Sequence, residues 1–189
     1  MPRGIAKDHD EKRAALRQGA ARYFAKNGYD RASMTGAARE CGVSKALIYH
    51  YYDSKEDLLF DILQAHLSGL SDSVEAARDN GLSSLIHAIL AAYSDADAEH
   101  KLQLDALATL PPEMQKPLID LQRQLVTIMS DAIVAENPAL AGDRLRAATM
   151  TVFGILNWFY MWNRPGKGLT RTEYADLATD FVRGGLAAL

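Results

Sequence analysis

The sequence predicts an all-α protein of about nine helices, and three observations support this fold class. Apolar residues recur at spacings of three and four along most of the chain, as they do on the buried face of an amphipathic helix. Sustained alternation of apolar and polar residues, which marks a half-buried strand, is absent. Glycine, proline and capping residues interrupt the helical pattern repeatedly and divide it into segments.

The first three predicted helices have clear ends. Gly28 follows the first helix at the position where glycine adopts a left-handed conformation. Ser33 is expected to cap the second helix, which Gly42 stops, and Ser44 is expected to cap the third. In chain order, these helices span about 8–27, 34–41 and 45–50.

The remaining six predicted helices are mostly longer. Either Asp53 or Ser54 caps the fourth helix, and either Thr170 or Thr172 starts the last. Pro117 falls in the first turns of the seventh and predicts a displaced start, because proline lacks an N–H group. In chain order, the six span about 55–78, 83–97, 99–109, 113–136, 143–163 and from 170 or 172 to the C-terminus.

The composition excludes several classes of protein. The chain has 189 residues, of which 48% are hydrophobic and 24% charged, values typical of an ordinary globular protein. Its single cysteine, Cys41, excludes an internal disulfide and fits a reducing compartment. The charged N-terminus lacks the apolar stretch of a signal peptide, and no apolar run is long enough to span a membrane. We therefore predict a cytoplasmic protein with no membrane partner.

The charges are distributed unevenly along the chain. Residues 1–55 contain eleven basic and six acidic residues, a net charge of +5. The remainder contains ten basic and eighteen acidic residues, a net charge of −8. A basic head on an acidic body suggests that only the head meets a polyanion. The alternative is chance asymmetry between two solvated surfaces.

Residues 33–52 have the pattern of a helix-turn-helix. Small residues at Ala37 and Ala38 allow two helices to approach closely, and Gly42 allows a tight turn between them. Val43 and Ile48 are expected to fill the core of the module. The second helix of such a pair fits the major groove of DNA, where its N-terminal side chains meet bases and phosphates.

The residues around this motif resemble those of the tetracycline-repressor (TetR) family of bacterial transcription regulators. The resemblance is carried by Phe24, by Gly28-Tyr29, by Gly-Val-Ser-Lys-Ala-Leu-Ile-Tyr-His-Tyr-Tyr at 42–52 and by Asp-Ser-Lys-Glu-Asp-Leu at 53–58. It is close over residues 8–60, whereas the rest of the chain matches the family only in helix number and length. It implies a DNA-binding domain at 1–54 and an effector-binding and dimerisation domain at 55–189.

Three residues depart from the usual family pattern in this segment. Ala46 replaces a glycine and Tyr52 replaces a phenylalanine, and both changes are conservative. Leu47 replaces a frequent threonine at a base-facing position, so it is expected to read a thymine methyl group or no base at all.

By this resemblance, eight residues are candidates for DNA contact. The alternatives are that Tyr49 packs, that Lys45 is a solvated charge and that Thr35 belongs only to a capping turn. The phosphate-contact candidates are Ser33, Thr35, Ser44, Tyr49 and Lys55, and the base-edge candidates are Lys45, Leu47 and His50.

The helix predicted over 143–163 is apolar on almost every side, which is typical of a helix buried on two sides. Because one short recognition helix reads few base pairs, specific binding generally needs two copies on a palindrome. We therefore expect a homodimer, built from this helix and the last one. The alternative is a core helix in a monomer. The interface candidates are Phe153, Trp162, Leu177 and Phe181.

The middle helices resemble the ligand-binding core of the family. Residues 154–162 and 164–168 are also similar to the C-terminal part of regulators of fatty-acid, phenylacetate and sterol catabolism, which respond to acyl-CoA thioesters. Each candidate contact has the alternative of an ordinary core or surface position. The candidates are His66, His87, Tyr93, Gln122, Asn157 and Trp158.

No catalytic pattern is present. The five histidines lack metal-ligand spacing, and neither a phosphate-binding glycine loop nor a Gly-x-Ser-x-Gly motif occurs. We predict no enzyme activity, no metal and no cofactor. The predicted function is that of a repressor that binds operator DNA as a dimer and is released by a small hydrophobic effector, with acyl-CoA thioesters as candidates. The alternative is a helix-turn-helix DNA-binding protein without an effector.

Overall fold

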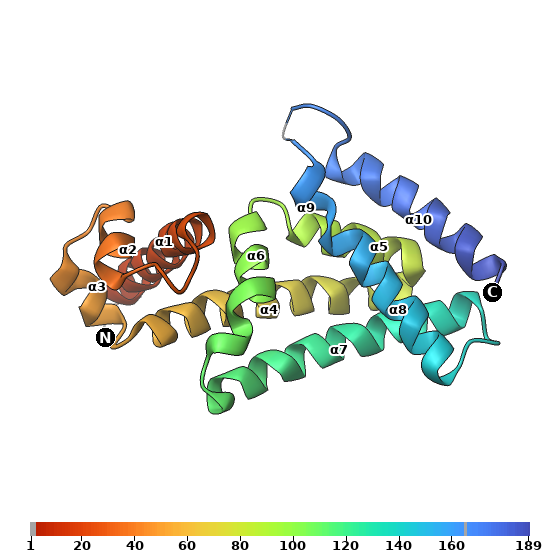
Figure 1. Cartoon of the computed structure of the whole chain (residues 1–189), viewed down its shortest axis with the longest axis horizontal. Helices are drawn as coiled ribbons and strands as arrows, with labels where there is room; N and C mark the ends of the chain where they lie inside the picture. The colour runs from red at the N-terminus through yellow and green to blue at the C-terminus, as the bar shows by residue number, and fades with distance from the viewer. Residues whose placement is uncertain (1–2, 165) are drawn as a thin grey trace. The chain divides into compact units, whose positions relative to one another are not determined.

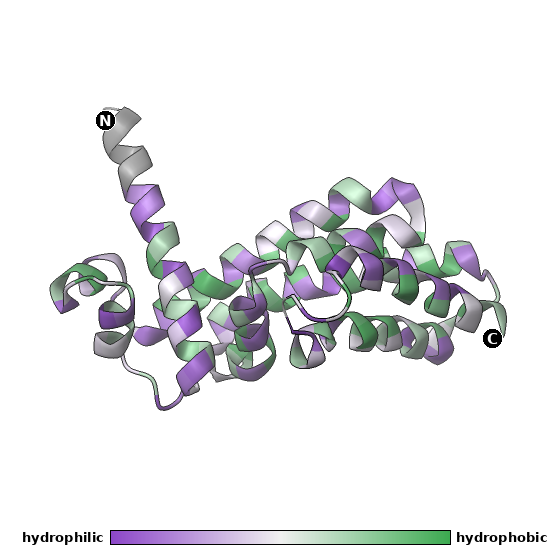
Figure 2. Ribbon diagram, turned by 90° about the horizontal axis from the view of Figure 1, so that it is seen from above, coloured by the Kyte–Doolittle hydropathy of each residue, from purple (hydrophilic) through white to green (hydrophobic). Residues whose placement is uncertain are grey.

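The structure is a computed structural model that describes residues 3–164 and 166–189, with the backbone alone for residues 3–8. It confirms the predicted all-α fold. The described residues form ten α-helices and two short 3-10 helices and contain no β-strand (Figure 1). Apolar and polar residues alternate around most helices, as expected for helices with one buried face (Figure 2).

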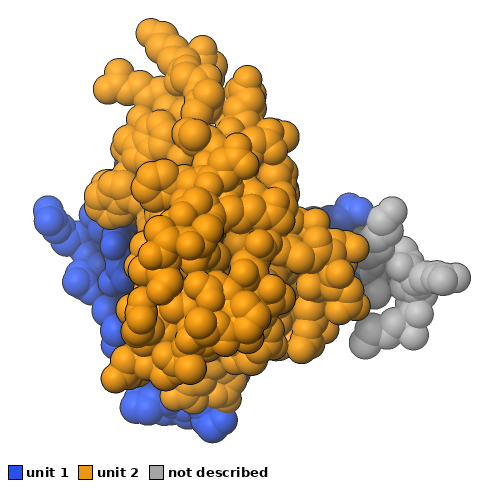
Figure 3. Space-filling model, turned by 90° about the vertical axis from the view of Figure 1, so that its right-hand side faces the viewer, with its two compact units in different colours: residues 1–66, 96–118 blue, residues 67–95, 119–189 orange. Residues whose placement is uncertain are grey.

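The chain divides into two compact units, each made of two separate stretches (Figure 3). The first unit comprises residues 1–66 and 96–118, and the second comprises residues 67–95 and 119–189. These boundaries differ from the functional division expected after residue 54, because residues beyond it pack with the N-terminal helices. The functional division stays a prediction.

In the first unit, α1 packs against both α2 and α6, and α2 packs against α3. Phe24 of α1, Ile48 of α3 and Leu58 of α4 are fully buried and join these helices in one core. The unit contains α1 (Arg3–Asn27), α2 (Met34–Glu40), α3 (Lys45–Tyr51), the first half of α4 (Lys55–Ala77), α6 (Asp97–Ala106), η2 (Leu107–Thr109) and the start of α7 (Pro112–Glu136).

In the second unit, α5 packs against α8 and α10, and α8 also packs against α10. Leucine and isoleucine side chains of α5 supply much of the core, including the buried Leu85, Ile86 and Ile89. The unit contains the rest of α4, η1 (Arg78–Asn80), α5 (Gly81–Ala92), the rest of α7, α8 (Gly142–Asn157), α9 (Phe159–Trp162) and α10 (Arg171–Ala187). Within the described part of the chain, no helix is long and apolar enough to cross a membrane.

Two helices differ from their expected form. The helix predicted over 143–163 is broken at Trp158 into α8 and the short α9, and this break lets Phe159 turn inward. Phe159 is buried and stacks on Tyr174 of α10 with 4.5 Å between ring centroids. Pro117 does not displace the start of α7: the helix begins at Pro112, a residue favoured at the first helical position, and continues through Pro117.

The open alternatives for two helix caps are resolved. Ser54 rather than Asp53 caps α4, since its Oγ accepts the backbone N–H of Asp57 at 3.0 Å. Thr170 rather than Thr172 caps α10, where it forms a reciprocal capping box with Glu173.

Candidate nucleic-acid interface

The connection between α2 and α3 has the geometry of a helix-turn-helix. Ser33 Oγ accepts the Gly36 N–H and Ser44 Oγ accepts the Leu47 N–H, both at 3.1 Å, so both predicted caps are confirmed. Gly42 has a φ of +67°, in the left-handed region that side chains disfavour. Local chemistry therefore determines where each of these two seven-residue helices begins and where the turn between them lies.

The interior of this module consists of small or branched residues. Ala37, Ala38 and Ile48 are buried, as predicted, whereas Val43 is half-buried. The phenol ring of Tyr23 on α1 lies over Gly36 of α2, where an added Cβ atom would be 1.9 Å from Tyr23 Oη. The glycine that weakens α2 as a helix is thus needed for the close packing of α1 on α2.

The outer face of α3 carries the four residues expected to lie nearest the bases or the sugar-phosphate backbone. Lys45, Leu47, Tyr49 and His50 are all exposed, and Ile48 is the residue of α3 that is buried. Leu47 is 37% and Tyr49 42% exposed, so two large side chains lie on the surface without cover. The Lys45 ammonium lies 5.7 Å from the Tyr49 ring centroid, within cation–π range.

The hydroxyl candidates Ser33, Thr35 and Ser44 are exposed at the start of α2 and α3. In Ser33 and Ser44 the oxygen accepts a backbone N–H for the cap, and the hydroxyl hydrogen remains available to donate. Donation of this kind suits the oxygens of a phosphate.

Lys55 is more constrained than the other candidates. Its ammonium donates to the carbonyl oxygens of Tyr29 at 3.1 Å and Ala32 at 3.3 Å, and it lies 4.3 Å from the Tyr29 ring centroid. Two of its three N–H donors therefore hold the loop between α1 and α2. A phosphate contact by Lys55, which stays a prediction, would use the third.

Sequence reasoning missed the polar contacts behind α3. Asp61 of α4 is buried and accepts hydrogen bonds from Arg13 and Arg17 of α1 and from Tyr52, the C-terminal cap of α3. The available signal was an aspartate within the apolar stripe of the fourth helix, a position that needs a partner.

The six residues predicted to bind an effector do not form one cluster. Tyr93 and Asn157 of the second unit meet, since Tyr93 Oη donates to Asn157 Oδ1 at 3.0 Å, and burial raises the pKa of Tyr93. His87 lies between the Ser83 carbonyl at 2.9 Å and the Asp176 carboxylate at 3.0 Å. Gln122 is half-buried on α7, and Trp158 is 58% exposed.

His66 belongs to the first unit, where its ring lies 6.0 Å from that of the buried His100. Burial, followed by the neighbouring His100, lowers the pKa of His66 to about 4. The ring is therefore neutral at physiological pH. Within the described residues, no group of three or more His, Cys, Asp or Glu side chains is arranged to hold a metal ion.

The predicted dimer residues fall into two groups. Trp162, Leu177 and Phe181 are exposed, and Phe181 is 71% exposed. Phe153 is instead buried in its own unit, because it belongs to the stripe of α8 that packs inward. The outward stripe of α8 is spaced by three and four residues and consists of Ala147, Met150, Thr151, Gly154 and Trp158.

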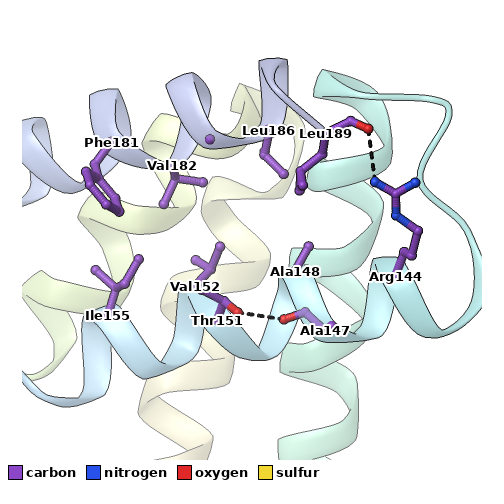
Figure 4. Close-up of a pocket in the computed structure, with 11 residues that line it drawn as sticks. Arg144, Ala147, Ala148, Thr151, Val152, Ile155, Phe181, Val182, Leu186 and Leu189 are labelled. Atoms are coloured by element: carbon purple, nitrogen blue, oxygen red, sulfur yellow. Dashed lines mark hydrogen bonds between the residues drawn. The ribbon is translucent and has the colours of Figure 1, made fainter.

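A groove of about 370 Å³ runs between α8 and α10 (Figure 4). Phe181, Val182 and Leu186 of α10 point toward Val152 and Ile155 of α8 across this groove. Arg144 stands at one end, where it donates to the Leu189 carbonyl at 3.0 Å. None of the six predicted effector contacts lines the groove.

Two family models together match most of the chain. Residues 16–62 match the model described as bacterial regulatory proteins of the tetR family. Residues 76–186 match the model described as the tetracyclin repressor-like C-terminal domain. The chain belongs to the TetR family. It is therefore a DNA-binding transcriptional regulator, and the family resemblance of its N-terminal part extends through the domain that follows.

Individual relatives agree with this assignment. The chain is 25% identical to the HTH-type transcriptional activator FasR of Mycolicibacterium smegmatis, over 98% of this chain and 87% of FasR. A TetR-family regulator from Bordetella parapertussis has a TM-score of 0.86 at 29% identity, over 94% of this chain and 96% of that one. AibR, solved in complex with isovaleryl coenzyme A and operator DNA, has a TM-score of 0.72 at 22% identity, over 94% of this chain and 97% of AibR.

Proposed function

We propose that this TetR-family chain regulates transcription by placing α3 in the major groove of a palindromic operator. The observation that carries this proposal is the exposed face of α3, where a cation, a phenol, an imidazole and an uncovered leucine stand together on a capped helix. The net charge of +5 on residues 1–55 supports it, since it attracts DNA to this end of the chain.

The active form is a homodimer in this proposal, and the second copy covers the outward faces of α8 and α10. Met150 of α8, Trp158 at the C-terminal cap of α8, and Leu177 and Phe181 of α10 are each more than half exposed, which is unfavourable for large apolar side chains in water. Gly154 and Gly184 lie exposed on the same helices and allow close helix approach. Met150 and Trp158 take the place of the buried Phe153 among the interface residues.

The proposed effector is an acyl-CoA thioester. One relative and one sequence similarity support this class: AibR was solved with isovaleryl coenzyme A, and residues 154–162 and 164–168 are similar to regulators that respond to acyl-CoA thioesters. Effector binding in the second domain would favour a state in which the two recognition helices no longer match successive major grooves, about 34–36 Å apart. A coupling of about 1–3 kcal/mol would weaken DNA binding about 5–150-fold.

We propose that the protein represses transcription and that it acts in the cytoplasm. FasR, a relative that aligns along most of the chain, is named an activator. Transcription from the selected operator, measured with and without the protein, separates the two signs, because a repressor lowers it and an activator raises it.

The DNA-binding proposal is tested with duplexes selected from a random-sequence pool by repeated binding to the full chain. We expect a palindromic consensus. Because Lys45 is a base-edge candidate, Lys45→Ala should weaken binding to the consensus more than to random duplexes, and the loss of its charge should also lower the slope of log affinity against log salt. Lys167→Ala, the same change at an exposed lysine of the second unit, is the matched control and should leave both unchanged. Absence of a consensus would contradict the proposal.

The effector proposal is tested by titration calorimetry with acetyl-, isovaleryl- and palmitoyl-CoA against free coenzyme A. We expect heat from at least one thioester and release of the consensus duplex by the same compound. Tyr93→Phe and Asn157→Ala should weaken the binding of that thioester, because each removes one partner of the part-buried hydrogen bond between two candidate contacts. If no thioester of any chain length gives heat or releases the duplex, the result would favour a regulator without an effector.

A further inference from the structure

One carboxylate of α4 holds two other segments of the first unit. Asp61 accepts a bidentate pair of hydrogen bonds from Arg13, from Nε at 2.9 Å and from Nη2 at 2.8 Å. Arg17 Nη1 lies at 3.4 and 3.5 Å from the two carboxylate oxygens. Tyr52 Oη donates to Asp61 Oδ2 at 2.6 Å. A residue of α4 therefore bonds both to α1 and to the end of α3.

This contact matters for α3 because the helix is short and buries little of its own surface, although Tyr51 also stacks on His9 of α1 with 4.8 Å between ring centroids. Ile48 is the buried residue within its seven positions, and Tyr52, its C-terminal cap, is 4% exposed. Ile48 anchors the helix through non-directional apolar contact, whereas the Tyr52–Asp61 bond depends on direction as well as distance. Burial and the hydrogen bond to Asp61 both raise the pKa of Tyr52, so the phenol remains a donor at physiological pH.

We propose that Asp61 is a positioning residue that sets the orientation of the recognition helix α3 relative to α1 and α4. The inference rests on the proposed DNA-binding function, since it assigns how the reading helix is held. The Arg13 fork fixes the carboxylate plane against α1, and the Tyr52 bond then ties the end of α3 to that plane.

The same geometry makes Asp61 a point at which α4 controls DNA affinity. Asp61 lies in the second turn of α4, and this helix continues without a break to Ala77. A rotation or shift of α4 moves the carboxylate and pulls on Tyr52, so α3 changes its angle without any change in its DNA-contacting residues.

The test separates orientation from charge and from stability. Tyr52→Phe removes only the Oη bond, and Asp61→Asn removes the charge while keeping the size of the side chain. At a temperature well below unfolding, we expect both variants to bind the selected consensus duplex about fivefold or more weakly, comparable to the loss of one base contact. Their binding to random duplex and their salt slopes should remain those of the wild type, because no phosphate contact is lost.

Tyr174→Phe is the matched control, since it deletes another phenol hydrogen bond, from Tyr174 Oη to the Ile155 carbonyl at 2.9 Å, in the second unit. It should leave consensus affinity within about twofold of the wild type. If Asp61→Asn does not fold, the affinity of Tyr52→Phe for the consensus duplex alone tests the positioning role.

Wild-type consensus affinity in Tyr52→Phe, with Lys45→Ala still weakening binding, would overturn the positioning role and leave the proposed function intact. Failure of the wild type itself to prefer any sequence would overturn both.

Discussion

The helix-turn-helix and the α8–α10 face are two surfaces of this chain that are suited to different partners. The first consists of short helices that begin at two serine caps and are joined by a turn at the left-handed Gly42. A hydrogen bond to Asp61 holds the end of the second of these helices. The second consists of longer helices that leave large apolar side chains exposed, with few polar contacts to direct them.

This difference fits what each surface is proposed to recognise. Base edges in a groove are read by directional hydrogen bonds, so a small error in helix orientation removes specificity. A second copy of the chain is recognised by apolar area and shape, which tolerate small shifts as long as water is excluded. The helix-turn-helix is therefore held in place by hydrogen bonds, whereas the α8–α10 face is held in place by packing.

The largest expected effect tests whether the α8–α10 face is an interface. Phe181→Glu places a charge in the apolar face and should yield a monomer in sedimentation velocity at micromolar concentration. Affinity for the palindromic duplex should then fall about 100-fold or more, because one half-site no longer assists the other. Leu104→Glu makes the same change at an exposed leucine of α6 and should remain dimeric. A dimeric Phe181→Glu protein would contradict the interface.

The next effect concerns the half-buried His66 of the first unit and the buried His100 beside it. The pKa of His66 is lowered from 6.5 to about 4. Between pH 6.5 and pH 4, His66 is therefore protonated in the unfolded chain and neutral in the folded chain. His66 thus contributes stability that is complete above pH 6.5 and is lost as the pH falls, by up to about 3 kcal/mol at pH 4.

Urea unfolding between pH 7.5 and pH 4 measures this loss. His66→Gln should remove a large part of the pH dependence, whereas His9→Gln, at a half-exposed position of α1, should preserve it. A pH dependence that is equal in wild type and His66→Gln would assign the loss to other groups.

A smaller effect tests the close packing behind the reading helices. Gly36→Ala inserts a methyl group where Tyr23 Oη lies, and it should lower the free energy of unfolding by about 1–3 kcal/mol. Gly69→Ala in α4 has nothing within 4 Å of the new atom and should be neutral or slightly stabilising. Adding Tyr23→Ala to Gly36→Ala should produce a smaller loss than the sum of the two single losses, and strict additivity would argue against the clash.

The smallest effect compares one cap from each region. Ser44→Ala and Thr170→Ala each delete a side chain that accepts a backbone N–H, and each should lower the free energy of unfolding by about 1 kcal/mol. Only Ser44→Ala should also weaken binding to the consensus duplex, since its hydroxyl is a phosphate-contact candidate. Equal affinities of the two variants for the consensus duplex would mean that Ser44 caps the helix but does not contact a phosphate.

Several elements of the molecule could be predicted from short-range patterns. The ends of α2 and α3, the Gly42 turn and the burial of Ile48 follow from capping, left-handed glycine and helical spacing, which act within a few residues. The break at Trp158 could not be predicted, because the apolar pattern continues through it and Phe159 is buried through contacts with the distant Tyr174 and Arg171.

The sequence by itself determined the helical class, the reading motif and the exposed candidates on α3, because periodicity, caps and turns are local. The tertiary structure decided which side of α8 faces out, that Lys55 holds a loop, and that Asp61 binds both α1 and the end of α3. These contacts join residues 9 to 48 positions apart, and side-chain spacing along one helix carries no information about them.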